Sequence, residues 1–481
     1  TYQQVLGYEN RQWENHTYNP STARDEIENS RKGTAYLGFS KTENLTSEGY
    51  FTYLKEFNGG HNINATAGYS YFETNGEGFN MTNYNFSVDG IKYWDMNQGS
   101  YLSDGKAAMS SSKNITEKLF SVFARVNYSY NDKYMASASI RHEGSSKFAA
   151  DNRWANFWSV TAGWRISNED FMKDVSWVND LKVRFGYGVT GNNDFSASYM
   201  ANLLGSDTNW MLPNGTWAYS YGKTQNVNPN LGWEEKKEWD LGLDYSLFDG
   251  RLYGKFDYYR RKIDNLLYSV KVPQPPYTQG TQYQNIGSME SKGWEFEIGG
   301  DIIQNKEFTW TSNLNMSHTT GKILTLWGNN TYYNGNGFVA PGTPGDAARI
   351  EEGSTIGSFY IWKFAGFDDD GNFLLYNKDG EVIPAEKKTE NDKQFIGNYT
   401  PKLILGWNNT FSYKNFDLGI NMRSWIDFDV YNTINMYYGI QGRGNTNVLK
   451  EAYGKFNHIK GEKQICDYYL EDGTFLKIDA I

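Results

Sequence analysis

Apolar and polar residues alternate strictly over several stretches of the chain between Lys118 and Val189. This period of two is typical of a β-strand, in which successive side chains point to opposite faces. The first stretch runs from Lys118 to Tyr130, and the pattern returns from Trp158 to Ile166 and from Leu181 to Val189. Each stretch has about ten residues, the length of a tilted strand that crosses a bilayer. The pattern therefore predicts strands with one apolar face, which must be covered by lipid or packed in a protein core.

The connections between the predicted strands are of two kinds. Some are tight, namely Asn131–Lys133, Asp249–Gly250, Asn305–Lys306 and Lys414–Asn415, whereas those from about residue 190 to Glu235 and from Thr319 to Gly397 are long. Asp-Gly and Asn-containing turns supply the left-handed backbone that short hairpins require. We therefore expect three antiparallel hairpins: Leu241–Leu247 with Leu252–Tyr258, Ile298–Ile303 with Phe308–Met316, and Leu403–Tyr413 with Phe416–Met422.

A sheet with short turns at one end and long loops at the other is the plan of an outer-membrane barrel, whose turns face the periplasm. A β-sandwich does not segregate its loops in this way. The predicted fold class is all-β, a transmembrane antiparallel up-and-down β-barrel with long extracellular loops. Alternation places Arg125, Lys182, Arg184 and Asp244 on its inner face.

The number of predicted strands indicates an incomplete barrel. The pattern yields roughly fourteen strands, fewer than in large plugged transporters, and an open barrel would leave strand edges unpaired in lipid. The chain starts at Thr1 without a signal peptide or initiator methionine, and it ends inside the strand-like run Thr474–Ile481. We therefore expect residues 1–481 to be one domain, a part of a barrel wall from a longer protein.

Composition agrees with a barrel and excludes other classes. The 481 residues are 17% aromatic with a mean hydropathy of -0.69, and no run of about twenty apolar residues forms a transmembrane helix. Composition alone would suit a large secreted all-β protein equally well. The net charge of -10 argues against nucleic acid as a partner. The single cysteine, Cys466, cannot form an internal disulfide and is expected to be a small side chain near a loop.

Several segments resemble the SusC/RagA-like TonB-dependent transporters and follow that family's order. These are residues 140–148 (IRHEGSSKF), 158–167 (WSVTAGWRIS), 181–192 (LKVRFGYGVTGN), 228–234 (NPNLGWE), 242–245 (GLDY), 285–295 (NIGSMESKGWE) and 413–418 (YKNFDL). Together they span most of the chain from Lys118 onward, whereas residues 1–117 carry weaker signatures.

The resemblance implies a 22-stranded barrel in the outer membrane of a Gram-negative bacterium, closed by an N-terminal plug. It implies import of an oligosaccharide or a peptide, not an enzymatic reaction, and no cofactor. The expected partners are a SusD-like surface lipoprotein, TonB through the plug, and outer-membrane lipid, with a dimer of transporter–lipoprotein pairs. The plug and the final strands have no counterpart in residues 1–481, and we expect the natural protein to hold them elsewhere.

Ring side chains outside the alternating runs are candidates for contact with substrate or partner. They are Tyr93, Trp94, Trp210, Trp217, Tyr332 and Tyr333. Sugar rings and peptide side chains stack on such faces. The alternative is that these rings pack loop against loop or against the lipoprotein, because large rings dominate interface burial.

One acidic stretch offers oxygen ligands suited to calcium, with Asp368, Asp370 and Asn372 as the candidates. It lacks the distal glutamate of an EF-hand loop, and the alternative is a solvated acidic turn ordered by Gly371 and Gly380. The five histidines show no metal-ligand spacing, and no carboxylate pair can be nominated for glycoside hydrolysis, so no catalytic residue is predicted.

Two functions compete. The first is the wall of a TonB-dependent importer. The alternative is a secreted or surface-anchored all-β glycan-binding module without transport, in which the greasy faces would meet across a sandwich core.

Overall fold

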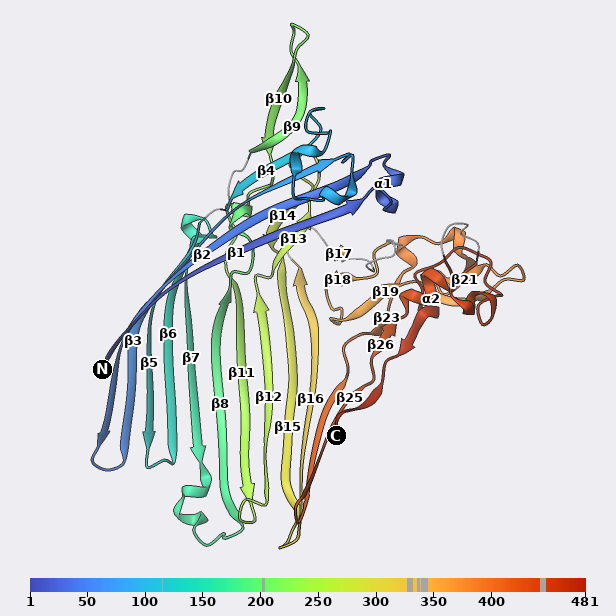
Figure 1. The fold of residues 1–481 in the computed structure, drawn as a ribbon. Helices are drawn as coiled ribbons and strands as arrows, with labels where there is room; N and C mark the ends of the chain where they lie inside the picture. The colour runs from blue at the N-terminus through green and yellow to red at the C-terminus, as the bar shows by residue number, and fades with distance from the viewer. Residues whose placement is uncertain (115, 201–203, 327–331, 335–337, 339–344, 442–446) are drawn as a thin grey trace.

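The computed structural model of the chain describes residues 1–481 except 115, 201–203, 327–331, 335–337, 339–344 and 442–446. Its main feature is one 15-stranded antiparallel sheet in which each long strand pairs with the next long strand of the chain (Figure 1). In spatial order the strands are β1 (Tyr2–Pro20), β2 (Gly33–Phe57), β3 (His61–Tyr84), β5 (Glu117–Tyr130), β6 (Tyr134–Ser145), β7 (Trp154–Arg165), β8 (Val178–Asn192), β11 (Glu234–Leu247), β12 (Leu252–Asp264), β15 (Gly287–Gln304), β16 (Phe308–Leu326), β24 (Leu403–Tyr413), β25 (Phe416–Ile426) and β28 (Phe475–Ala480), with β4 (Ala108–Lys113) also on β3. The up-and-down order is the predicted one.

The three predicted hairpins are confirmed by their registers. Leu247 pairs with Leu252, Ile298 with Leu314, and Tyr413 with Phe416. The turn residues adopt the expected left-handed backbone, with φ of 53° at Asp132 and 59° at Asp249.

Short turns and long loops also segregate as predicted, with the long loops at the upper end of the sheet in Figure 1. One connection at the lower end departs from the rule. Residues 166–177 join β7 to β8 through two 3-10 helices, Ile166–Asn168 and Asp170–Met172. Within it, the Glu169 carboxylate accepts hydrogen bonds from the Tyr134 hydroxyl at 2.6 Å and the Trp164 indole at 3.0 Å.

The strands are longer than predicted, because several continue beyond the alternating apolar stretch into the loop layer. β2 has 25 residues and β3 has 24, and β16 runs to Leu326 and does not end near Thr319. The long loops hold further strands: β9 (Leu204–Met211), β10 (Trp217–Lys223), β13 (Leu267–Lys271), β14 (Thr281–Asn285), β17 (Tyr332–Asn334), β18 (Arg349–Glu351), β19 (Ser358–Ile361), β20 (Lys363–Phe367), β21 (Phe373–Tyr376), β22 (Val382–Pro384), β23 (Gln394–Asn398), β26 (Asp429–Tyr431) and β27 (Leu470–Asp472). The described residues also form two short α-helices, α1 (Arg24–Glu28) and α2 (Thr433–Tyr438), and several single-turn 3-10 helices. In the part of the chain that the structure describes, no helix is long and apolar enough to span a membrane.

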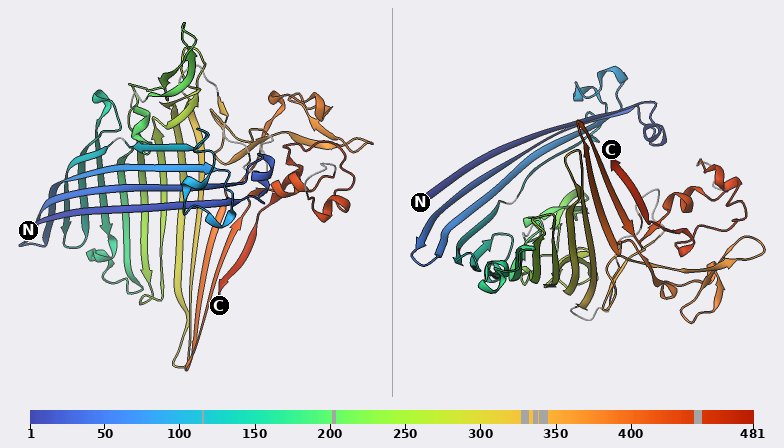
Figure 2. Two further views of the ribbon diagram at one scale, coloured as in Figure 1. Left: turned by 45° about the horizontal axis from the view of Figure 1, so that its top comes forward. Right: turned by 90° about the horizontal axis from the view of Figure 1, so that it is seen from below.

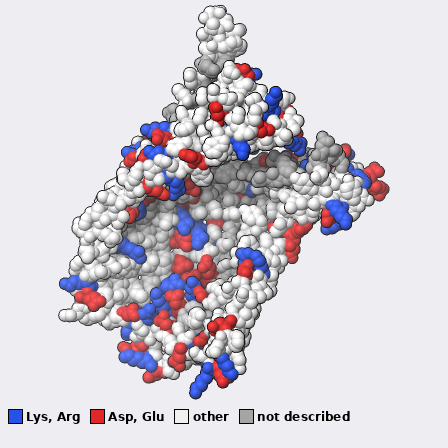
Figure 3. All heavy atoms as spheres, in the orientation of Figure 1, with Lys and Arg blue, Asp and Glu red and all other residues white. Residues whose placement is uncertain are grey.

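The sheet curves into an open trough (Figure 2). Charged side chains gather on its hollow face (Figure 3), and alternation directs the apolar residues to the opposite, convex face. These apolar side chains remain 38–53% exposed, as for Phe120, Val122, Val126, Ile140, Trp158, Val160, Trp164, Phe185 and Leu241. A sandwich would bury them against a second sheet, so the exposed convex face favours a wall that lipid covers.

Aromatic rings border this apolar face on its upper side. Trp239 stands opposite Tyr187, and Tyr258 stands opposite Trp294. We name the row Trp158, Tyr187, Trp239, Tyr258 and Trp294 the upper aromatic line. On β7 the band extends from Trp158 to Trp164, about 20 Å at the rise of an extended strand. Aromatic rings at both ends of the apolar stretch of a strand are typical of a transmembrane barrel.

Candidate functional site

The hollow face of the trough is polar and tied together by charged side chains. Arg184 on β8 makes two hydrogen bonds to the Asp244 carboxylate on β11, at 2.8 and 2.9 Å, and a third to Asp257 on β12 at 2.8 Å. On the next strands, Lys255 pairs with Glu297 at 3.4 Å, and Asn313 donates to the same carboxylate at 2.9 Å. These contacts couple adjacent strands across the wall.

Beside this network lies a hollow of about 730 Å³ on the inner face of β2 to β11. Arg125, Lys182 and Arg184 line it, together with Asp240 and with amide and hydroxyl groups such as Asn64 and Ser137. Arg125, Lys182, Arg184 and Asp244 therefore lie on the inner face, as the alternation predicts. A surface of this kind offers hydrogen bonds and charge to a passing solute or to a protein segment inside the barrel.

Removing the Arg184 cation should weaken the wall. We expect Arg184→Met to lower the unfolding free energy by about 1–2 kcal/mol, because Asp244 and Asp257 would face each other without a cation and a one-third-exposed site still admits water. The loss of stability is measured in gels of the detergent-solubilised protein, as the temperature at which the heat-modifiable band of the folded barrel disappears. Arg125→Met is the matched control. The Arg125 guanidinium donates to Asn127 and pairs with no carboxylate among the described residues, so equal effects of the two substitutions would contradict the network.

Three buried apolar clusters hold the upper loops together. In the first, Phe148 from the β6–β7 connection packs against Leu231 and Trp233 from the β8–β11 connection. The Trp233 indole donates to the Arg153 carbonyl at 3.0 Å. These rings belong to two of the segments that carry the family resemblance, residues 140–148 and 228–234, which the fold thus brings into contact. In the second cluster, Ile286 packs against Ile323 and Leu326 of β16.

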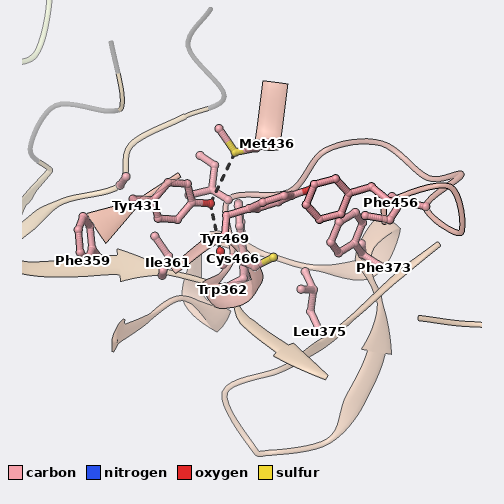
Figure 4. Packing of buried hydrophobic residues seen from close by; sticks show 14 residues of the cluster. Phe359, Ile361, Trp362, Phe373, Leu375, Tyr431, Met436, Phe456, Cys466 and Tyr469 are labelled. Carbon is pink, nitrogen blue, oxygen red and sulfur yellow. Dashed lines mark hydrogen bonds between the residues drawn. The ribbon is translucent and has the colours of Figure 1, made fainter. Parts of the chain in front are cut away.

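The third cluster is the largest and was not predicted from the sequence. It joins two long loops, and we name its described residues in 345–401 and 427–474 the loop unit. Phe373, Leu375, Ile361 and Met436 are almost completely buried there (Figure 4). The Tyr431 hydroxyl lies 3.1 Å from the Cys466 carbonyl and 3.6 Å from the Met436 sulfur.

A buried lysine adds to the loop unit. The Lys393 side chain is 1% exposed, donates to the Asp346 carbonyl at 2.7 Å and lies 4.4 Å from the centre of the Trp362 ring. A cation over an indole face is favourable, and more so when it is shielded from water. The loop unit therefore has the packed core of a small domain.

Cys466 lies in the long connection between β26 and β27, as expected of a small side chain near a loop, and it belongs to this buried core. Cys466 is 0% exposed, and burial raises the pKa of its thiol to about 12. We expect its thiol to stay protonated and unmodified by a maleimide at pH 8 in the folded protein, and to react fully in denaturant. Mass spectrometry of the peptide that contains Cys466 measures this, with Ser103→Cys in an exposed loop as the reactive control. Rapid native labelling at Cys466 would contradict a packed loop unit.

The predicted ring candidates have different surroundings. The Tyr93 ring contacts those of His16 and Trp94 in tilted arrangements, with ring centroids 4.2 and 4.8 Å away, and Trp94 is 77% exposed. Trp217 is 68% exposed on the β9–β10 hairpin, which projects above the sheet (Figure 1). Trp210 is on the same hairpin opposite Ala218, and its side chain lies outside the described residues. Trp210 and Trp217 therefore lie on β-strands and not in irregular loop structure.

The other two candidates are adjacent on β17 and face different ways. Tyr333 is 9% exposed and packs into the second cluster with Val270 and Leu326, so its ring is not available to a substrate. Tyr332 is partly exposed, and the Arg349 guanidinium lies between its ring and that of Tyr360, 3.8 Å from each centroid. Packing of loop against loop, the alternative left open by the sequence, therefore describes Tyr333, whereas Trp94 and Trp217 present free ring faces to solvent.

The acidic stretch forms a tight turn. The Asp368 carboxylate accepts hydrogen bonds from the backbone N–H groups of Asp370 and Asn372, at 3.0 and 2.7 Å, and from the Asn372 amide at 2.9 Å. The Asn372 amide and the backbone donors hold the pKa of the Asp368 carboxyl below its usual value. Gly371 has φ of 82°, and a Cβ there would lie 2.2 Å from the His458 carbonyl. These bonds order the turn from within, and no group of three or more His, Cys, Asp and Glu side chains among the described residues is placed to hold a metal ion.

Comparison with known proteins decides the family. The β-barrel model of TonB-dependent receptor-like proteins matches residues 1–432. The chain belongs to this family. Its members are outer-membrane β-barrel proteins of Gram-negative bacteria, so the predicted fold class and location are confirmed.

Individual relatives agree with the family assignment. The chain is 32% identical over 480 residues to TonB-dependent receptor P3 of Formosa agariphila, covering 93% of this chain and 46% of the relative. It is 30% identical over 383 residues to TonB-dependent receptor SusC of Bacteroides thetaiotaomicron, covering 76% of this chain and 37% of the relative. The solved structure of the RagAB peptide transporter matches with a TM-score of 0.80 and 21% identity over 99% of this chain and 52% of that one, which shows the barrel fold. The chain spans about half of the length of these relatives, or less.

Proposed function

We propose that this TonB-dependent receptor imports an oligosaccharide or a peptide across the outer membrane, together with a SusD-like surface lipoprotein. One observation supports this above all: a single wall has an apolar convex face, a charge-lined hollow face and a packed loop layer at one end. The exposed convex face opposes the alternative of a soluble glycan-binding module, because such a module would bury these side chains.

The proposed mechanism is displacement and involves no chemical step. The lipoprotein would cover the upper loops, and exposed rings such as Trp94 and Trp217 would contact the substrate as it is enclosed. Force transmitted from TonB to the plug would then open a path along the polar inner face, where Arg184 and its two carboxylates lie. A dimer of transporter–lipoprotein pairs is the assembly that the family resemblance favours.

The test uses a host strain from which the full-length gene is deleted. Growth is measured on a panel of oligosaccharides and peptides, each as the sole nutrient source, after complementation with the full-length gene and in a matched strain without TonB. We expect at least one substrate to support growth only when both the gene and TonB are present. Growth that is the same with and without the gene on every substrate would contradict import.

A further inference from the structure

Basic side chains gather on the outward face of the wall, directly above the upper aromatic line. They are Lys237 on β11, Arg260 and Lys262 on β12, Lys292 on β15 and Lys322 on β16, and we name them the outer basic patch. These side chains point outward, like those of Trp239, Tyr258 and Trp294. On β11, β12 and β15 each basic residue lies an even number of positions from the ring on its own strand, and Lys322 on β16 stands opposite Glu290, four positions from Trp294. Lys237, Arg260 and Lys292 are each two residues above a ring of the line, about 7 Å along the strand.

The register sets cations against one another within the patch. Lys237 stands opposite Lys262, and Arg260 stands opposite Lys292. Like charges in opposing positions destabilise a sheet unless anions neutralise them. Where no carboxylate of the protein lies beside such a cation, the arrangement favours an anionic ligand from outside the protein.

The carboxylates nearby neutralise only some of these cations. Asp264 pairs with Lys237 at 3.0 Å and with Lys262 at 2.8 Å, and Glu290 is engaged by Arg260 at 2.5 Å. Glu235 lies 3.3 Å from Lys237. Lys292 and Lys322 are exposed and form no ion pair with any described residue, although Lys322 stands opposite Glu290.

We propose that the outer basic patch binds the phosphate groups of lipid headgroups in the outer leaflet of the outer membrane. The patch is continuous with the apolar convex face below it, so the acyl chains of a bound lipid would lie against Leu241 and Phe256 while its headgroup meets the lysines. These contacts would fix the depth of the barrel wall in the membrane and would select the lipids that surround it. This inference goes beyond import and holds whichever cargo the protein carries.

The test compares lipid binding to the full-length protein in detergent, by native mass spectrometry with added lipid A. One lysine near an anionic lipid surface contributes a factor of about five in the binding constant. We therefore expect the double variant K292Q/K322Q to bind lipid A about 25-fold more weakly than the wild type. Binding of zwitterionic phosphatidylcholine should be unchanged.

The matched control, K306Q/K414Q, also removes two exposed lysines, but from the turns at the lower end of the sheet. It should bind lipid A as the wild type does. Heat-modifiable gel migration establishes that both variants retain the barrel. Equal lipid A affinity of all three proteins would overturn the proposal, as would displacement of lipid A by an equal concentration of inorganic phosphate, which would indicate a free-phosphate site.

Discussion

Replacing Ala138 by arginine is expected to lower the stability of the barrel in a bilayer by about 2–4 kcal/mol, the cost of a cation on the lipid face near the bilayer midplane. Ala138 lies on the convex face of β6 between Val126 and Val160, both of which are more than 40% exposed. Equilibrium unfolding in urea, with the full-length protein folded into phospholipid vesicles, measures this. At about 1.4 kcal/mol for each tenfold change, the loss corresponds to a factor of roughly 30 to 1,000 in the folding equilibrium.

The neighbouring residue provides a matched control. Ser137 is on the opposite face of the same strand and lines the inner hollow. The Ser137→Arg substitution introduces the same side chain where water reaches it, so we expect a change within about 0.5 kcal/mol. Equal losses at both positions would contradict the assignment of the convex face to lipid.

A second large effect is expected at Phe373, whose ring is 1% exposed in the loop unit and lies 4.8 Å from Phe367 between centroids. Replacing a fully buried phenylalanine by alanine costs about 3–5 kcal/mol, because the apolar contacts are lost and a cavity remains. The loop unit is a cluster of its own above the membrane, so Phe373→Ala should open it and leave the barrel folded. Limited proteolysis of whole cells should then cleave within the loop unit roughly 100-fold faster or more, while heat-modifiable migration of the barrel is retained.

Val382→Ala is the control for this substitution. Val382 is in the same loop unit on β22 and is 53% exposed, so its truncation should change stability by about 0.5 kcal/mol or less. If Phe373→Ala abolished the folded barrel, the loop unit and the wall would be one cooperative structure. If Phe373→Ala left the cleavage rate unchanged, the result would contradict a packed core in the loop unit.

The wall could be predicted from the sequence because each wall residue contacts only its neighbours in the sheet. Alternation alone identified β5, β7 and β8, and turn residues such as Asp132 and Asp249 fixed the hairpin registers. The extra strand length could not be foreseen. Above the bilayer the outward residues turn polar, as at Lys237 and Glu235, so the apolar signal ends before the pairing does.

The loop unit was missed because its strands are short and its contacts join distant segments. β19 has four residues and β26 has three, and a parallel bridge joins Trp362 to Cys466 across a hundred residues of chain. No periodicity is detectable over such lengths. The buried state of Tyr333 depends on the same kind of contact, since its neighbours Val270 and Ile323 come from other loops and strands. A single cysteine in an acidic, polar segment was the one local signal of a core, because unpaired cysteine is usually buried.

The measurement that tests the central claim most directly is purification of the full-length natural protein from detergent-extracted outer membranes of its host, followed by identification of the proteins that accompany it. The proposed importer predicts recovery in the outer-membrane fraction with a SusD-like lipoprotein in equal amounts. Recovery as a soluble monomer that needs no detergent and carries no partner would contradict both the membrane wall and the importer.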